Sequence, residues 1–148
     1  MAILLCALVN IWENGGKIDT LEIEEGRCIE AKQNIEEVGV SDRINVIYGD
    51  ATEILPTIQE QYDMIFIDAA KGKYLFFLEQ ALRLIRQGGY IIADNVLYKG
   101  YVLSDYNKHK QRTAVTKLRK YLELVQENEE LETQILHVGD GLAISKKK

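Results

Sequence analysis

Acidic and amide side chains end two apolar runs of the sequence, where they could bind a cation. Asp68 ends one run in FIDAAKGKY, and Asp94 and Asn95 end the next in YIIADNV. A single acid at a strand end could be a helix cap, but two acids and an amide together are harder to explain in that way. Ligation by oxygen alone suits Mg²⁺, Mn²⁺ or Ca²⁺ rather than zinc. Such a cation can hold a substrate hydroxyl and lower its pKa, which eases formation of a nucleophilic oxyanion.

Lys71 stands three residues after Asp68 and is the candidate for a general base. If the chain turns tightly after the strand, the ammonium group of Lys71 can approach the activated oxygen. Nearby positive charge would lower the pKa of this ammonium and allow a neutral amine to accept a proton. The alternative is a surface lysine near a helix start, which is how we interpret Lys73 and Lys99.

Two other acids could bind a nucleotide, one near the end of an earlier predicted strand and one just after the next. Glu22 in TLEIEEG could accept hydrogen bonds from both hydroxyls of a ribose, or it could be an acid favoured by a helix N-terminus. Asp50 follows INVIY and could reach a purine edge, or it could cap the helix that begins at Ala51.

Alternating strands and helices must position these residues. Apolar periodicity predicts strands over residues 18–23, 44–48, 64–67, 90–93, 133–138 and 142–145, and helices over 28–38, around 54–55, and over 73–86 and 108–128. This order predicts one α/β domain over residues 1–148, with a mostly parallel sheet and an antiparallel hairpin around the turn Gly139-Asp140-Gly141. Ligands bind beyond the carboxyl ends of strands in such sheets, so the acids are expected at one edge.

The start of the chain, MAILLCALVNI, is apolar, and we interpret residues 1–11 as a buried helix. It has no Lys or Arg ahead of it and no cleavage site after it, unlike a signal peptide. No stretch of the sequence approaches the ~18 apolar residues of a membrane helix. Cys6 and Cys28 lack paired spacing, which argues against a disulfide framework or a zinc site.

Charge is unevenly distributed along the last third of the chain. Residues 107–120 hold six Lys or Arg and no acid, whereas residues 121–132 hold five Glu and no base. The basic run is either a solvated helix face or a surface for a polyanionic substrate. The net charge of -5 argues against a protein that coats nucleic acid.

Four segments together resemble one enzyme family. They are TLEIEEGRCIEAKQNIEEVGVSDRINVIYGDATEILP, YDMIFIDAAKGKY, GGYIIADNVLYKG and VGDGLAISKKK. They are similar to the cation-dependent O-methyltransferases of the caffeoyl-CoA and catechol type, and nearest to a bacterial branch that methylates 5-hydroxyuridine in tRNA. The resemblance implies a Rossmann-like sheet that binds S-adenosylmethionine.

The resemblance also implies a role for each candidate residue. Glu22 would bind the ribose of S-adenosylmethionine, and Asp50, Ala51 and Asp68 would line the cofactor pocket. Asp68, Asp94 and Asn95 would ligate Mg²⁺, Mn²⁺ or Ca²⁺, and Lys71 would be the catalytic base. The methyl acceptor would be tRNA or a small hydroxylated aromatic molecule. A cytoplasmic homodimer without membrane contact is the expected state.

The sequence departs from this family's pattern at its start. Residue 1 matches a point inside the helix that follows the family's glycine-rich loop, so we expect a sheet without its first strand and two strands without their shared neighbour.

Two other functions stay open. One is an NAD-dependent oxidoreductase, because an acid after the second strand also suits the ribose of NAD. The other is a truncated chain that only associates with a partner.

Overall fold

The computed structural model describes residues 5–10, 16–104 and 111–148, with side chains described from residue 16 onward. Its seven-stranded sheet has the order β3-β2-β1-β4-β5-β7-β6. The strands are β1 (Leu5–Asn10), β2 (Lys17–Glu22), β3 (Ile44–Tyr48), β4 (Tyr62–Asp68), β5 (Ile85–Asp94), β6 (Leu131–Leu136) and β7 (Leu142–Lys147). The α-helices are α1 (Glu25–Val38), α2 (Ala51–Ile54), α3 (Tyr74–Leu84) and α4 (Arg112–Glu127), and the 3₁₀ turns are η1 (Leu55–Thr57), η2 (Lys71–Lys73) and η3 (Tyr101–Leu103).

Most strands of the sheet point in the same direction. β2 pairs with β3, and β4 with β5, in parallel registers. β1 is antiparallel to both β2 and β4, and β7 is antiparallel to both β5 and β6. Only β1 and β7 are therefore reversed among the seven strands, and the predicted α/β sheet with a C-terminal antiparallel hairpin is confirmed.

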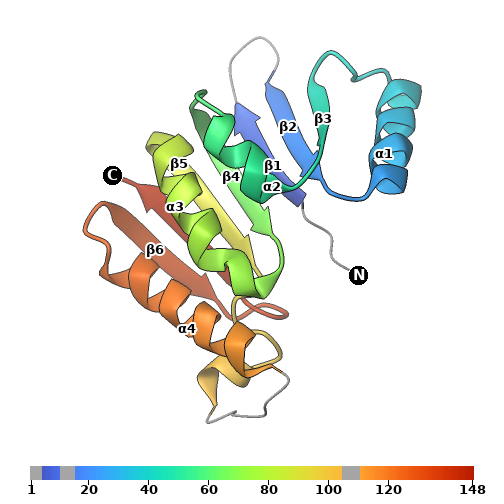
Figure 1. Cartoon of the computed structure of the whole chain (residues 1–148). Helices are drawn as coiled ribbons and strands as arrows, with labels where there is room; N and C mark the ends of the chain where they lie inside the picture. Colours follow the sequence, from blue (N-terminus) through green and yellow to red (C-terminus); the bar gives the residue numbers. More distant parts are fainter. Residues whose placement is uncertain (1–4, 11–15, 105–110) are drawn as a thin grey trace.

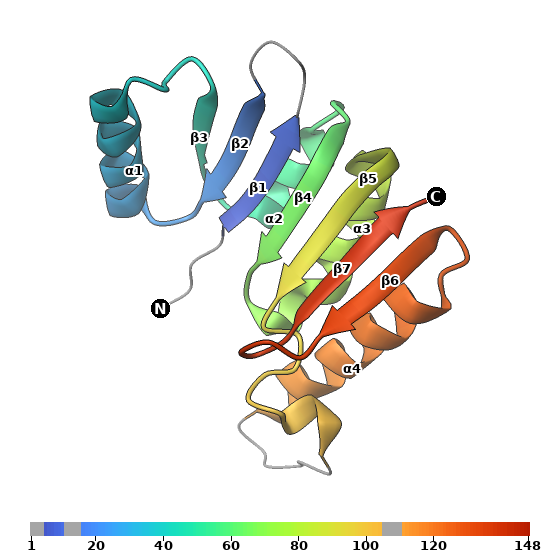
Figure 2. The ribbon, with the colours of Figure 1, turned by 180° about the vertical axis from the view of Figure 1, so that it is seen from behind.

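Helices cover one face of the sheet. In Figure 1, α2, α3 and α4 lie in front of the strands, and α1 lies beside the edge strand β3. From behind, β1, β4, β5 and β7 are in plain view (Figure 2). The main core lies under the helices, where Ile65 and Ile67 of β4 and Ile91 of β5 are at most 1% exposed. Among the helices of the described ranges, none combines the length and apolar character needed to cross a membrane.

The predicted helix over residues 1–11 is wrong, because Leu5–Asn10 forms β1. This strand lies in the middle of the sheet, where we expected a first strand to be missing. Ala7, for example, pairs with Thr20 of β2 on one side and with Phe66 of β4 on the other. The facing edges of β2 and β4 carry backbone donors and acceptors that need partners. An apolar segment of this length can supply the missing partners by forming a strand between β2 and β4. Because it comes directly before β2 in the chain, it pairs with β2 in the antiparallel direction.

The boundary between α3 and β5 also differs from the prediction. We expected a helix to Arg86 and a stop at Gly88-Gly89, but α3 ends at Leu84 and both glycines lie inside β5. Gly89 is needed for packing, because a Cβ there would lie 2.8 Å from the carbonyl oxygen of Asp63 and 2.8 Å from the side chain of Ile85. Arg86 forms an ion pair with Asp63 of β4. Ile85 pairs with Tyr62, which starts the strand before the glycines, and the register then shifts so that pairing resumes only at Tyr90. Gly88, with φ 79°, and Gly89 therefore lie in an irregularity inside β5.

The C-terminal hairpin holds the chain that leaves β5. Gly141 lies in the left-handed region at φ 86°, and its carbonyl accepts a hydrogen bond from the amide of Val96 at 3.1 Å. The amide of Leu97 donates to the carbonyl of Asp140 at 2.8 Å. A Cβ at position 141 would collide with the side chain of Leu97. The hairpin turn is therefore packed against the segment directly after Asp94 and Asn95.

We expect Gly141→Ala to lower the free energy of unfolding by about 2–3 kcal/mol, because it adds both backbone strain and a steric clash. Gly139→Ala is the matched control: Gly139 has φ 55°, but a Cβ there meets nothing within 4 Å. It should cost only about 1 kcal/mol. Urea unfolding of both variants measures the difference, and equal losses would mean that contact with Leu97 is unimportant.

Candidate active site at the carboxyl edge of the sheet

Four acidic residues lie at the carboxyl ends of strands that point in the same direction. Glu22 ends β2, Asp68 ends β4 and Asp94 ends β5. Asp50 follows β3 after one residue and is the N-cap of α2. The parallel register therefore brings every predicted acid to one edge of the sheet, as in other α/β proteins that bind ligands there.

The ammonium group of Lys71 lies at the centre of the site. Its Nζ atom is 3.7 Å from Oδ1 of Asp68 and 3.3 Å from Oδ1 of Asn95. It also donates to the backbone carbonyl of Asp94 at 3.2 Å and to the hydroxyl of Tyr74 at 2.7 Å. The ends of β4 and β5 are thus joined through one lysine side chain, which is 15% exposed.

Burial changes the electrostatics of Lys71. Loss of solvent lowers the pKa of its ammonium, while the carboxylates of Asp68 and Asp94 partly oppose this change. From the sequence we expected nearby positive charge to lower this pKa. Among the described residues the cause is instead burial, and the charges around Lys71 are negative.

Tyr74 is a residue of this site that we did not predict. Its side chain is fully buried, and its hydroxyl donates to the carbonyl of Asp94 at 2.5 Å while accepting from Lys71. Its ring contacts Tyr121 edge to face at 5.5 Å between centroids. Burial raises the pKa of the Tyr74 phenol. The spacing of Lys71 and Tyr74 in AAKGKY, three residues apart at a helix start, was the available signal.

The three predicted metal ligands surround the same region. Asn95 has φ 56°, a left-handed conformation that Asn tolerates better than most residues, and its backbone amide donates to Oδ1 of Asp94 at 2.6 Å. The described part of the chain contains no group of three His, Cys, Asp or Glu side chains suited to a metal. A metal here would therefore need the amide oxygen of Asn95. Because Asp68 and Asn95 already gather oxygens around a cationic group, the donor set fits a hard divalent cation.

The predicted nucleotide-binding residues lie at the end of β2 and just after the end of its neighbour β3. Glu22 is 7% exposed, and its Oε1 accepts a hydrogen bond from the amide of Glu24 at 2.8 Å. Asp50 caps α2 by accepting from the amide of Thr52 at 2.8 Å, which is the main cause of its lowered pKa. Ala51 is fully buried at the start of this helix. The capping role of Asp50 is therefore confirmed, and its second carboxylate oxygen lies 3.4 Å from Nζ of Lys73.

Two basic residues have structural contacts that the sequence did not reveal. Lys73, which we interpreted as a surface lysine, links the start of α3 to Asp50. Arg119 of α4 donates to the backbone carbonyls of Tyr101, Val102 and Ser104. Arg119 therefore ties η3, which follows the Asp94–Asn95 end of β5, to α4. These contacts join residues far apart in sequence, so spacing alone could not indicate them.

A sheet with five strands in one direction and acids at its carboxyl edge is typical of α/β proteins that bind ligands at that edge. A profile of the O-methyltransferase family matches residues 2–148. A catechol O-methyltransferase from Niastella koreensis is 34% identical over 139 residues, which cover 88% of this chain and 62% of the relative. The chain belongs to the O-methyltransferase family.

Solved structures agree with this assignment. An O-methyltransferase from Bacillus cereus in complex with SAH (S-adenosylhomocysteine) is 32% identical and superposes with a TM-score of 0.80 over 90% of this chain and 63% of that one. An O-methyltransferase from Streptomyces achromogenes involved in tomaymycin synthesis, in complex with S-adenosylmethionine, is 26% identical with a TM-score of 0.80, over 90% and 62% of the two chains. The Rossmann-like methyltransferase fold is confirmed. The chain spans about three fifths of the length of these relatives.

Proposed function

We propose that this chain is an S-adenosylmethionine-dependent O-methyltransferase, assisted by a divalent metal, that acts on a small hydroxylated aromatic molecule. The observation that carries the proposal is the gathering of Asp68, Asn95 and the end of β5 around Lys71. Relatives in complex with S-adenosylmethionine or SAH support the cofactor. Family membership favours methyl transfer over the NAD-dependent alternative.

The cofactor would lie along the ends of β2, β3 and β4. Buried Glu22 would hold the ribose hydroxyls, because only one of its carboxylate oxygens accepts from Glu24. Asp50 and Ala51 at the start of α2 would line the adenine pocket, and Asp68 would contact the cofactor from β4. The ion pair between Lys73 and Asp50 would fix this wall of the pocket.

The acceptor would bind between the ends of β4 and β5. Asp68, Asp94 and Asn95 would hold the divalent cation, a Lewis acid that lowers the pKa of an acceptor hydroxyl when bound. Lys71 would take the proton from this hydroxyl, since its Nζ already lies within hydrogen-bonding reach of Asn95 and Tyr74. Tyr74 would keep Lys71 against the end of β5. Aligning the acceptor oxygen with the methyl group would supply most of the remaining rate enhancement.

A second acceptor, 5-hydroxyuridine in tRNA, rests on the basic run at residues 107–120. Lys108 and Lys110 lie outside the described residues. Within α4, Arg119 binds loop carbonyls and Lys120 pairs with Glu123, so Arg112 and Lys117 are the cations of the described run that could reach phosphates. Catechol-type relatives and this small number of available cations favour the small aromatic acceptor.

Calorimetry and a methyl-transfer assay test the proposal together. The chain should bind S-adenosylmethionine and methylate catechol, and a chelator should lower the rate at least about 100-fold until Mg²⁺ is restored. Asp94→Ala should keep cofactor binding but lose the response to Mg²⁺. A chain that binds neither S-adenosylmethionine nor NAD would contradict an enzymatic role, and methylation that a chelator does not change would remove the metal from the proposal.

The homodimer expected from the resemblance is also a proposal. Tyr90 of β5 is 42% exposed, and in the view of Figure 2 no helix of the described residues covers the middle strands. Light scattering of the purified chain would measure its mass, and a monomer at micromolar concentration would contradict this state.

A further inference from the structure

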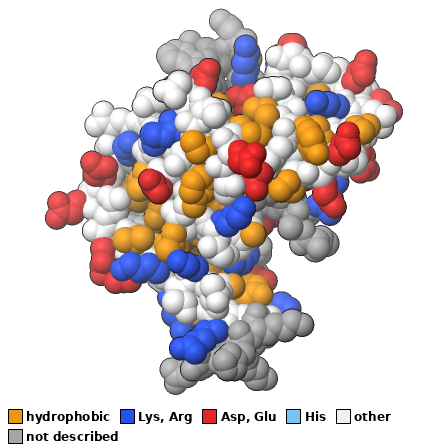
Figure 3. All heavy atoms as spheres, viewed as in Figure 1, with side chains coloured by type: hydrophobic (Ala, Val, Ile, Leu, Met, Phe, Trp, Pro, Cys, Tyr) orange, Lys and Arg blue, Asp and Glu red, His pale blue; other side chains and the backbone are white. Residues whose placement is uncertain are grey.

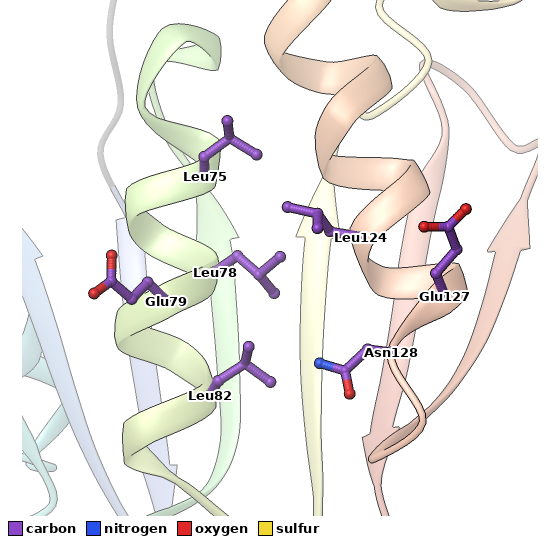
Figure 4. Close-up of a pocket in the computed structure, with 7 residues that line it drawn as sticks. All are labelled: Leu75, Leu78, Glu79, Leu82, Leu124, Glu127 and Asn128. Carbon is purple, nitrogen blue, oxygen red and sulfur yellow. The ribbon is translucent and has the colours of Figure 1, made fainter.

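A groove lies between α3 and α4 on the helix-covered face, and it runs from Leu75 near the start of α3 to Asn128 at the end of α4. Its volume is about 560 Å³. Figure 4 shows Leu75, Leu78 and Leu82 pointing from α3 toward α4, and Leu124 pointing back toward them. Leu124 is 39% exposed. The leucines on α3 follow a spacing of three and four residues, so they form one apolar stripe about 10 Å long, equal to two helical turns.

Acidic groups flank this apolar floor on both sides. Glu79 lies on the outer side of α3 and Glu127 on the outer side of α4 (Figure 4). Within the described ranges, neither carboxylate has an ion-pair partner. Asn128 points into the groove at the end of α4, and its Oδ1 accepts from the amide of Glu130, so its NH₂ group is the donor available there. The C-terminal end of α4 adds negative potential at the same place.

The groove also gives a role to the acidic run at residues 121–132, which the proposed methyl transfer does not use. This run supplies Glu127 and the acids that follow α4. On the helix-covered face, hydrophobic side chains reach the surface with both acidic and basic side chains among them (Figure 3). An apolar floor with negative flanks would repel nucleic acid, and it complements a ligand with one apolar face and cationic edges.

We propose that this groove binds a cationic amphipathic helix of a partner protein, with apolar residues at i, i+3 or i+4, and i+7 over the leucines. Lysines or arginines on the flanks of that helix would pair with Glu79 and Glu127, and Asn128 would donate to its last carbonyls. A second copy of this chain fits poorly among the described helices. Helix α1 of a second copy would offer the exposed Ile29, but this helix is acidic and would be repelled by the acidic flanks. Helix α4 of a second copy would not be available, because its apolar face is already buried.

Fluorescence anisotropy with a labelled 14-residue Leu/Lys peptide of helical periodicity tests the proposal. The chain should bind this probe with a micromolar Kd. A peptide of the same composition with its leucines distributed around the helix should bind at least 10-fold more weakly. Leu124→Lys and the double variant Glu79→Lys/Glu127→Lys should each weaken binding of the first peptide at least 10-fold.

The double variant Glu30→Lys/Glu37→Lys on α1 is the matched control, because it makes the same charge change on exposed acids of another helix. It should retain binding within about twofold. Thermal unfolding should show that all variants fold. The proposal would be overturned if the control variant lost as much peptide affinity as the groove variants. It would also be overturned if the two peptides bound equally well, or if the groove variants bound the first peptide as tightly as the unchanged chain. Because binding is measured without cofactor or acceptor, its failure would be distinct from failure of the proposed methyl transfer.

Discussion

Replacing Lys71 with alanine is expected to lower kcat for methyl transfer at least about 100-fold while changing the Kd of S-adenosylmethionine less than about twofold. General bases contribute roughly 10²–10⁴-fold to rates. Nζ of Lys71 lies within reach of Asp68, Asn95 and Tyr74 at the proposed acceptor side of the site. A group that acts only on the acceptor proton affects the transition state rather than cofactor binding. Single-turnover methyl transfer and calorimetry measure the two quantities.

Lys73 offers a matched control two residues away. Lys73→Ala removes the same charge from the same turn, but Lys73 contacts Asp50 on the proposed cofactor side. This variant should weaken S-adenosylmethionine binding severalfold and leave kcat nearly unchanged. If both variants lose cofactor affinity and rate together, the lysines support the turn before α3, and Lys71 has no separate role in chemistry.

The polar residues at strand ends could be predicted from sequence because their positions follow from local patterns. Asp68 and Asp94 each end an apolar strand, and parallel strands bring such ends to one edge. Asp50 could be predicted as a cap because it precedes a helix start. The contact between Lys71 and the carbonyl of Asp94 could not be predicted, because it depends on the turn geometry of η2 and on a backbone atom 23 residues away in sequence.

Errors in the predicted fold have one physical cause, which is that pairing between distant segments overrides local preference. Gly88 and Gly89 suggest a turn, but pairing of Ile85 with Tyr62 starts β5 before them, and they form an irregularity inside the strand. The N-terminal apolar run has no clear period, so length and composition alone do not separate a buried helix from a buried strand. Its conformation depends on the free edges of β2 and β4, which only the assembled sheet presents.

The central position of β1 makes a second large effect testable. We expect Ala7→Pro to lower the free energy of unfolding by on the order of 3 kcal/mol, because proline lacks the amide that a strand paired on both sides must donate. Ala7 pairs with Thr20 and with Phe66, so solvent cannot easily replace the lost partner. Such a loss is a large fraction of the 5–15 kcal/mol that typically stabilises a domain.

Ala7→Gly is the matched control, since it keeps the amide and should cost only about 1 kcal/mol. Urea unfolding compares the two variants, and hydrogen exchange locates the damage. In the proline variant, amides of β2 and β4 beside β1 should exchange faster, whereas those of β6 and β7 at the opposite edge should keep most of their protection. If proline accelerates exchange only within residues 5–10, or costs no more than glycine, this segment does not join β2 to β4. The two parts of the sheet would then be held together by the packing of Leu21, Ala51 and Leu55 in the helix-covered core.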